Sequence, residues 1–273
     1  RAFPTVDFRM DHIAVGEFWN GNAEAWTKLA RAGYDVYRDQ LNTPAFLAML
    51  PRVAGLAGLD VGCGEGHNTR QVGRLGATMT AIDIAEIFIR HARAEEVRAP
   101  LGITYHHGSA VELPYAAASF DFATAFMSLM DIPETAQALA EAFRVLRPGG
   151  FLQFSMTHPC FNPPHRRNCR DEDGNTFAIE VGDYFIDARG RVDEWTFGVA
   201  PASLRERLAK FRVPRFHRPI GEWFNLLLAA GFQIERVEEP RPSSQTVRDY
   251  PLLQDAEVVA YFLHLRVRKP AAG

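Results

Sequence analysis

The segment that decides the fold is Leu59-Asp60-Val61-Gly62-Cys63-Gly64-Glu65-Gly66. Asp60 lies within a short apolar stretch, and glycines follow at three alternate positions. Glycine has no Cβ and readily adopts positive φ, so a ligand can approach the main chain of such a turn. A helix-compatible run over 67–75 comes next, and the free N–H groups at the start of a helix face a ligand. The pattern predicts a strand, a glycine turn and a helix.

Two nucleotide-binding interpretations compete for this turn. The dinucleotide fingerprint has its third glycine three positions after the second, where this chain has His67, so NAD is disfavoured. The pattern D-x-G-x-G-x-G instead resembles the S-adenosylmethionine (SAM) binding turn of class I methyltransferases. A turn of this kind can also be purely structural, so the rest of the chain has to decide.

Composition narrows the class of protein. The chain has 273 residues, 47% of them hydrophobic, with a net charge of −3 and three cysteines. The absence of a basic run disfavours a nucleic-acid substrate. No stretch reaches the roughly 20 apolar residues of a membrane span, and the residues up to Gly16 lack the apolar core of a signal peptide. We therefore expect a cytoplasmic protein without a disulfide framework.

Strand-like and helix-like patterns alternate from Leu59 to Phe154 at the spacing of βαβ units. The expected strands are 59–61, 78–83, 103–106, 120–126 and 151–156, and the expected helices after the glycine turn are 85–97 and 132–146. A helix at 219–230, a strand at 232–237 and a long, antiparallel last strand at 257–267 complete the pattern. The fold class is thus α/β.

Two segments lie outside this alternation. Residues 1–52 read as a helical cover, in which Asn42 or Thr43 caps a helix with Pro44 at its first position. Residues 157–215 are too long for a connection and read as an inserted cap with a small β element near 176–179 and 184–186. The expected divisions are the cover at 1–52, the core at 53–156, the cap at 157–215 and the completion of the sheet at 216–273.

Five features together resemble class I SAM-dependent methyltransferases of type 11, the small-molecule branch that includes the ubiquinone/menaquinone methyltransferases. They are the glycine turn, Asp83 at the end of the second strand, Gly108-Ser109-Ala110, Phe120-Asp121 and Arg144-Val145-Leu146-Arg147-Pro148-Gly149-Gly150. Their common order is more specific than any one of them. The resemblance implies a Rossmann-like sheet of seven strands and, as cofactor, SAM with S-adenosylhomocysteine as product.

The resemblance also implies a set of cofactor-binding residues. Asp60 would stabilise the methionyl ammonium, Asp83 would accept the ribose hydroxyls, and Ile84 would pack on adenine. The family usually has an acidic residue where Ser109 stands, which leaves a weaker, neutral contact there. The full set is Asp60, Gly62, Cys63, Gly64, Gly66, Asp83, Ile84, Ser109, Ala110, Phe126, Met127, Tyr37 and Arg38. Phe126 and Met127 are equally ordinary core residues, and the helices that carry Tyr37 and Arg38 could simply pack on the sheet.

Candidate catalytic residues lie after the fourth and fifth strands, where open α/β sheets bind ligands. His158 is a possible general base because histidine titrates near neutral pH, although a structural histidine is an equal alternative. Asp131 is a second candidate that could instead cap a helix beginning at Ile132. Histidines and cysteines at 158–169 do not match common zinc spacings, so no metal is expected.

These patterns predict SAM-dependent methyl transfer to a small molecule. Aromatic residues of the cap, among them Trp195 and Phe197, suit an apolar or aromatic acceptor, or they form the cap's own core. The alternative function is a SAM-binding regulatory or scaffolding protein without turnover. The acceptor atom and the oligomeric state are left open.

Overall fold

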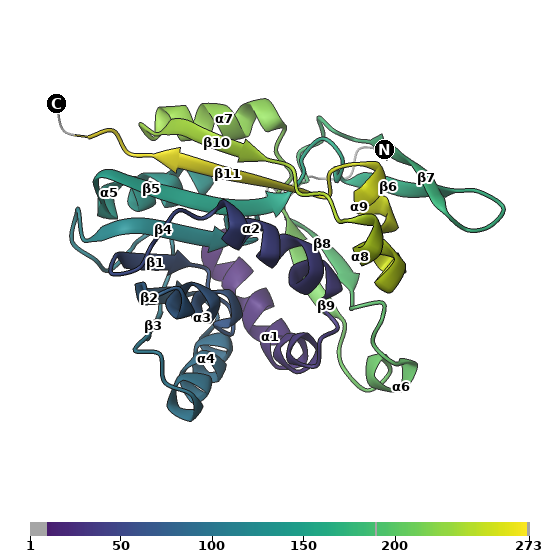
Figure 1. Cartoon of the computed structure of the whole chain (residues 1–273), viewed down its shortest axis with the longest axis horizontal. Helices are drawn as coiled ribbons and strands as arrows, with labels where there is room; N and C mark the ends of the chain where they lie inside the picture. Colours follow the sequence, from purple (N-terminus) through teal and green to yellow (C-terminus); the bar gives the residue numbers. More distant parts are fainter. Residues whose placement is uncertain (1–9, 189, 272–273) are drawn as a thin grey trace, which may run out of the picture.

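The computed structural model describes residues 10–188 and 190–271, so residues 1–9 of the expected cover lie outside the described part. A single seven-stranded sheet forms the centre, in the order β10-β11-β5-β4-β1-β2-β3 (Figure 1). Its strands are β1 (Ala57–Val61), β2 (Thr78–Asp83), β3 (Thr104–His107), β4 (Phe120–Phe126), β5 (Leu146–Thr157), β10 (Gln233–Glu238) and β11 (Phe262–Arg268). The expected Rossmann-like sheet is confirmed.

Most strands of this sheet run parallel, and β11 pairs antiparallel with both β5 and β10. The antiparallel direction predicted for the last strand is correct. The predicted start of this strand at residue 257 is too early: residues 254–258 form a helix, α9 (Gln254–Val258), and β11 begins at Phe262. A short helix preceding a strand carries no periodicity long enough to separate the two.

Helices cover both faces of the sheet (Figure 1). On one face α5 (Thr135–Val145) and α7 (Ile220–Ala229) bury apolar residues such as Leu139 and Leu227 in the larger core cluster. On the other face α2 (Thr43–Met49), α3 (His67–Arg74) and α4 (Glu86–Arg98) contribute Phe46, Val72 and Ile89 to the second cluster. Burial on both faces explains why β4 and β5 read as continuous apolar runs.

The N-terminal cover begins with the long helix α1 (His12–Arg31), which packs on α4 and on β9 (Phe211–Arg215). A π-helical turn, η1 (Arg38–Asn42), then runs directly into α2. Asn42 occupies the N-cap position of α2 and Pro44 lies in its first turn, as expected, but the Asn42 side chain makes no capping hydrogen bond. Asn42 instead contacts Ser155 and His264 in the sheet, and the Thr43 hydroxyl donates to Asn68.

Two separate β-hairpins occupy the region expected to be a cap. One pairs β6 (His165–Arg170) with β7 (Thr176–Gly182) and projects from the body of the molecule (Figure 1). The other pairs β8 (Arg191–Trp195) with β9, and the short helix α6 (Ala202–Arg205) lies in its loop. Residues 184–186, expected to be a strand, form none. Near the C-terminus α8 (Ser244–Asp249), η3 (Pro251–Leu253) and α9 complete the structure.

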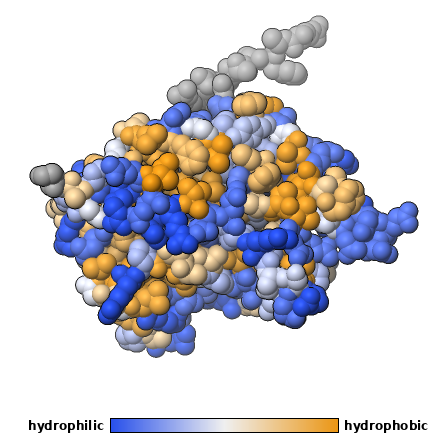
Figure 2. All heavy atoms as spheres, turned by 45° about the horizontal axis from the view of Figure 1, so that its top comes forward, coloured by the Kyte–Doolittle hydropathy of each residue, from blue (hydrophilic) through white to orange (hydrophobic). Residues whose placement is uncertain are grey.

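The surface mixes apolar and polar residues. On the face drawn in Figure 2, apolar side chains form patches that hydrophilic side chains interrupt. Within residues 10–188 and 190–271, no helix combines the length and the hydrophobicity that crossing a membrane requires.

Candidate functional site

The glycine turn between β1 and α3 keeps the main chain bare. Gly62, Gly64 and Gly66 all have positive φ. The Gly62 and Cys63 N–H groups both donate to the Ile82 carbonyl, which fixes the turn against β2. A Cβ on Gly64 would meet nothing within 4 Å, so this position faces open space. The turn therefore leaves room for a ligand beside Gly64.

Asp83 lies at the carboxyl end of β2, beside the turn. Its Oδ2 accepts from the Gly64 N–H at 2.8 Å and its Oδ1 accepts from the Ala85 N–H at 2.8 Å. Burial raises the pKa of this carboxyl, and the two N–H donors oppose that shift. Each carboxylate oxygen can accept a second hydrogen bond, so Asp83 keeps acceptor capacity for a ligand.

Asp60 is tied into the protein. Its Oδ2 accepts from the Thr69 hydroxyl at 2.5 Å and its Oδ1 from the Thr124 hydroxyl at 2.9 Å. Only 1% of its surface is exposed, and burial raises its pKa to about 6. Asp60 thus links β1 to α3 and β4, and it still forms part of a cavity wall.

One large cavity of about 760 Å³ lies at the carboxyl ends of the strands. Nearly all of the residues predicted to bind the cofactor line it: Asp60, Gly62, Cys63, Gly64, Asp83, Ile84, Ser109, Ala110, Phe126, Met127, Tyr37 and Arg38. Gly66 is not among the lining residues. Its positive φ and the Tyr105 hydroxyl, which would lie 2.7 Å from a Cβ, explain the glycine instead.

Ser109 and Ile84, the residues expected near the adenine, both line the cavity and also contact other parts of the protein. The Ser109 hydroxyl accepts from the Val111 N–H at 3.3 Å, so it stabilises its own loop while lining the cavity. Ile84 packs against Gly16 of α1, where a Cβ would come within 2.9 Å of the isoleucine. The sequence near Gly16 does not indicate this contact with Ile84, so the packing role of Gly16 was not predicted.

The N-terminal cover contributes a charged wall. Arg38 donates to Asp39 at 2.7 Å and lies 3.6 Å from Glu65, whose other oxygen accepts from Arg31. Glu65 lines the cavity, and its buried Oε1 has no hydrogen-bond partner among the residues that the structure describes. The ring of Tyr37 lines the cavity, while its hydroxyl donates to Asp255 at 2.5 Å.

These features fit the cofactor that the motifs imply. A buried acceptor on Glu65 suits an ammonium group, and the adjacent Arg38 suits a carboxylate. Asp83 suits vicinal hydroxyls, and the open space at Gly64 admits a ligand against the main chain. The cavity lies within the usual range of about 300–1,000 Å³ for small-molecule sites.

Asp131 enters the cavity from the segment after β4. It lies in a short 3₁₀ turn, η2 (Leu129–Asp131), and α5 begins only at Thr135, so Asp131 does not cap that helix. Its carboxylate makes no hydrogen bond within the described part of the chain and is 8% exposed. Burial raises its pKa to about 7 against the opposing charges of Arg215 and Arg218. Such a carboxylate can accept a proton near neutral pH.

The backbone before Asp131 is strained. Met127 has φ of 57°, which is unusual for a residue with a side chain, and its N–H donates to the Ser155 carbonyl. Ser128 follows, with its hydroxyl donating to the Val61 carbonyl. Strained residues of this kind concentrate at ligand sites, and here the strain turns the chain across the cavity.

His158 does not line the cavity. Only 2% of it is exposed, its Nε2 contacts Glu239 at 2.8 Å, and its Nδ1 accepts from the Cys160 N–H at 3.1 Å. Burial lowers its pKa, with Glu239 opposing the shift. With both ring nitrogens engaged, His158 supports the segment after β5 and is not brought together with Asp131.

Aromatic side chains form another part of the cavity wall. Trp26 of α1 contacts Trp19 of the same helix and also Trp195 and Phe197 of the second hairpin, with the rings of Trp26 and Phe197 centred 5.1 Å apart. All four residues line the cavity. The two alternatives posed for the cap aromatics therefore coexist, because these rings pack on one another and also face the cavity. Sequence reasoning missed the share of α1 in this wall.

Comparison with known proteins agrees with this geometry. A family model described as a methyltransferase domain matches residues 59–154. The chain is 36% identical over 116 residues to a ubiquinone biosynthesis O-methyltransferase of Aromatoleum aromaticum, covering 41% of this chain and 50% of that protein. It is 36% identical over 113 residues to a 27-O-demethylrifamycin SV methyltransferase of Amycolatopsis mediterranei, covering 40% and 42%. The chain thus spans half or less of the length of these relatives.

Among solved structures, a SAM-dependent methyltransferase from Mesorhizobium loti superposes with a TM-score of 0.66 at 28% identity, covering 82% of this chain and 96% of that one. The likeness therefore extends beyond the matched domain to most of the fold. Residues 59–154 thus match a methyltransferase domain, and the chain shares most of its fold with a SAM-dependent methyltransferase, in agreement with the sequence motifs.

Proposed function

We propose that this protein is a SAM-dependent methyltransferase that acts on a hydroxyl group of a small molecule. The observation that carries the proposal is a single cavity shared by the bare turn at Gly64, the carboxylate of Asp83 and the carboxylate of Asp131, which has no hydrogen bond from the described residues. Similarity to proteins named O-methyltransferases supports a hydroxyl acceptor. The comparisons give no support to a SAM-binding protein without turnover.

In this proposal the protein binds SAM, orients the acceptor toward it and removes the proton of the acceptor hydroxyl. SAM, when bound, supplies an electrophilic methyl group on its sulfonium sulfur. Asp83 and the turn fix the nucleoside, while Arg38 and Glu65 hold the amino-acid end. The aromatic wall excludes water, and Asp131 Oδ1 or Oδ2 takes the proton of the acceptor hydroxyl. Alignment inside a closed site supplies much of the rate of such displacements.

Calorimetry tests the cofactor part of the proposal. SAM and S-adenosylhomocysteine should bind, and NAD should not. Asp83→Ala should weaken SAM binding at least about 100-fold, because two hydrogen bonds to a charged acceptor are lost. Asp121→Ala is the matched control, since Asp121 accepts from the Ala57 N–H at the opposite end of the sheet. Unchanged SAM affinity in the Asp83 variant would contradict the ribose assignment.

A screen with methyl-labelled SAM tests the transfer. Small phenols and other hydroxylated aromatics are the first acceptors to try, with aromatic amines and thiols as the comparison set. Label should appear in the hydroxyl compounds. Transfer confined to amines or thiols would refute the choice of acceptor atom while leaving the cofactor assignment in place.

A further inference from the structure

A small second cavity continues from the main one past Asp131. Its volume is about 60 Å³, and both cavities share Asp131, Asp193 and Arg215. Arg191 and Arg218 complete the charged part of its wall. A space of this size admits a small substituent and no ring system, so it extends the acceptor end of the site by one functional group.

Three arginines and two carboxylates line this second cavity: Arg191, Arg215 and Arg218, with Asp131 and Asp193. Asp193 is shared, because its Oδ2 accepts from Arg215 Nε at 2.9 Å and its Oδ1 from Arg191 Nε at 3.3 Å. Within the described ranges, the terminal nitrogens of both arginines have no hydrogen-bond acceptor. Asp193 thus bridges the Nε atoms of two guanidinium groups, whose terminal nitrogens stay without a hydrogen bond from the described residues.

Arg218 adds a third, fixed cation. Its side chain is 12% exposed, and its nitrogens donate to the carbonyls of Phe216, Ile132 and Pro133. Its carboxylate neighbour Glu222 lies 3.6 Å away and is half exposed. Three neutral carbonyls fix the guanidinium in place, while the charges of Glu222, Asp187 and Asp131 act on it from nearby.

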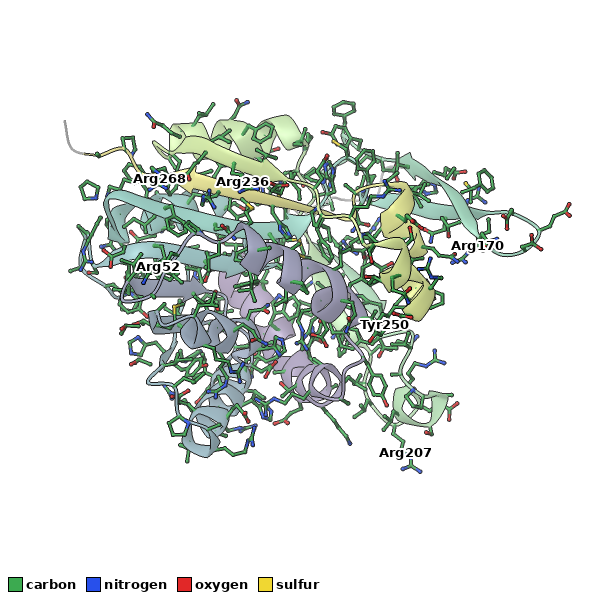
Figure 3. All side chains as sticks on the ribbon, viewed as in Figure 1. Arg52, Arg170, Arg207, Arg236, Tyr250 and Arg268 are labelled. Carbon is green, nitrogen blue, oxygen red and sulfur yellow. The ribbon has the colours of Figure 1, made fainter. Side chains whose placement is uncertain are left out.

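This arrangement is confined to one part of the molecule. In Figure 3, Arg207 extends outward at the edge of the molecule and Arg170 lies on the projecting hairpin of β6 and β7; solvent screens charges in such positions. Arg215 lines both cavities, and its side chain is 38% exposed, so solvent screens its charge only in part. A guanidinium in this position can bind a planar anion through two parallel hydrogen bonds.

We propose that the second cavity binds a carboxylate substituent of the methyl acceptor, with Arg215 as its direct partner. The inference rests on the proposed function and names its substrate class: an aromatic acid that also carries a hydroxyl group. With the carboxylate beside Arg215, the ring lies along the aromatic wall and the hydroxyl reaches Asp131, which both cavities share.

Isothermal calorimetry with matched probes tests this. Benzoate and phenylacetate are titrated against benzamide and phenylacetamide, into the full chain with and without S-adenosylhomocysteine. The acids should bind at least about tenfold more tightly than their amides, because a charge-assisted pair replaces a neutral contact. Arg215→Gln should abolish that preference, and Arg215→Lys should keep part of it.

Arg212→Gln is the matched control. Arg212 lies on the same strand, its side chain is 59% exposed, and it lines neither cavity. The preference should survive in this variant. Equal affinity for acids and amides, a preference that persists in Arg215→Gln, or no binding of either acid at about 10 mM would overturn the proposal.

The same titrations separate this proposal from the one before it. S-adenosylhomocysteine binding without any preference for the acids removes only the carboxylate site. Failure of S-adenosylhomocysteine to bind refutes the proposed function, and the titrations without it still report on the second cavity.

Discussion

Replacing Asp131 by asparagine should make the protein more stable and less active. The side chain is 8% exposed and makes no hydrogen bond within the described residues, and burial raises its pKa from 3.8 to about 7. The folded state therefore holds this proton more tightly than the unfolded state does. Stability from this group is fully present below about pH 4 and is lost as pH rises through about 7.

The size of the effect follows from the pKa difference. A shift of about 3 units corresponds to about 4 kcal/mol of unfolding free energy lost by pH 8. Asparagine stays neutral, so Asp131→Asn should exceed the natural protein in stability by about 4 kcal/mol at pH 8 and by about 2 kcal/mol at pH 5. For a chain of this size the gain is about 8 °C in Tm at pH 8 and about 4 °C at pH 5.

Thermal and urea unfolding at the two pH values measure this gain. Asp121→Asn is the control, because Arg147 and the Ala57 N–H lower the pKa of Asp121, so removing that charge should destabilise the protein at pH 8. In the transfer assay the natural protein should gain rate as pH rises through about 7, and Asp131→Asn should lose about 100-fold or more. A less stable Asp131→Asn at pH 8 would refute the account of an unpaired buried carboxylate.

Two further substitutions separate ligand contacts from support of the fold. Gly64→Ala should fold with a cost of about 1–2 kcal/mol for its positive φ, yet weaken SAM binding, because its Cβ enters open cavity. Gly62→Ala should lower Tm much further, since its Cβ would lie 2.3 Å from Ser128 Cβ; equal Tm values in the two alanine variants would contradict this geometry. His158→Ala should lose roughly 1–3 kcal/mol of stability through its lost partners, Cys160 and Glu239, and keep its turnover. Normal Tm with reduced turnover would return His158 to the role of base.

The residues of the cofactor half of the site could be predicted from the sequence because their patterns involve residues adjacent in the chain. The glycine turn needs positive φ at particular positions, and only glycine adopts that conformation freely, so the requirement is written into adjacent residues. Asp83 ends a strand whose apolar run is continuous, and parallel strands deliver their ends to one edge of the sheet. The motif does not predict the role of each glycine, however, because Gly66 fits the same motif but makes room for Tyr105 and does not line the cavity.

The residues of the acceptor half could not be predicted in the same way, because segments far apart in the sequence form it. Trp26 and Trp195 are far apart in the sequence yet contact each other, and the residues next to either one do not predict this contact. His158 and Asp131 were comparable as candidate bases from their types and positions. The structure separates them, since His158 has both nitrogens engaged and Asp131 is left without a hydrogen bond in the cavity.

The sequence by itself determined the α/β alternation, the antiparallel last strand and the turn beside Gly64, since periodicity and turn chemistry act between near neighbours. Only the tertiary structure decided which carboxylate lies in the cavity without a hydrogen bond from the described residues and which arginines lie near it. Burial and charge pairing depend on segments far apart in the chain, and these two quantities set the chemistry of Asp131 and Arg215.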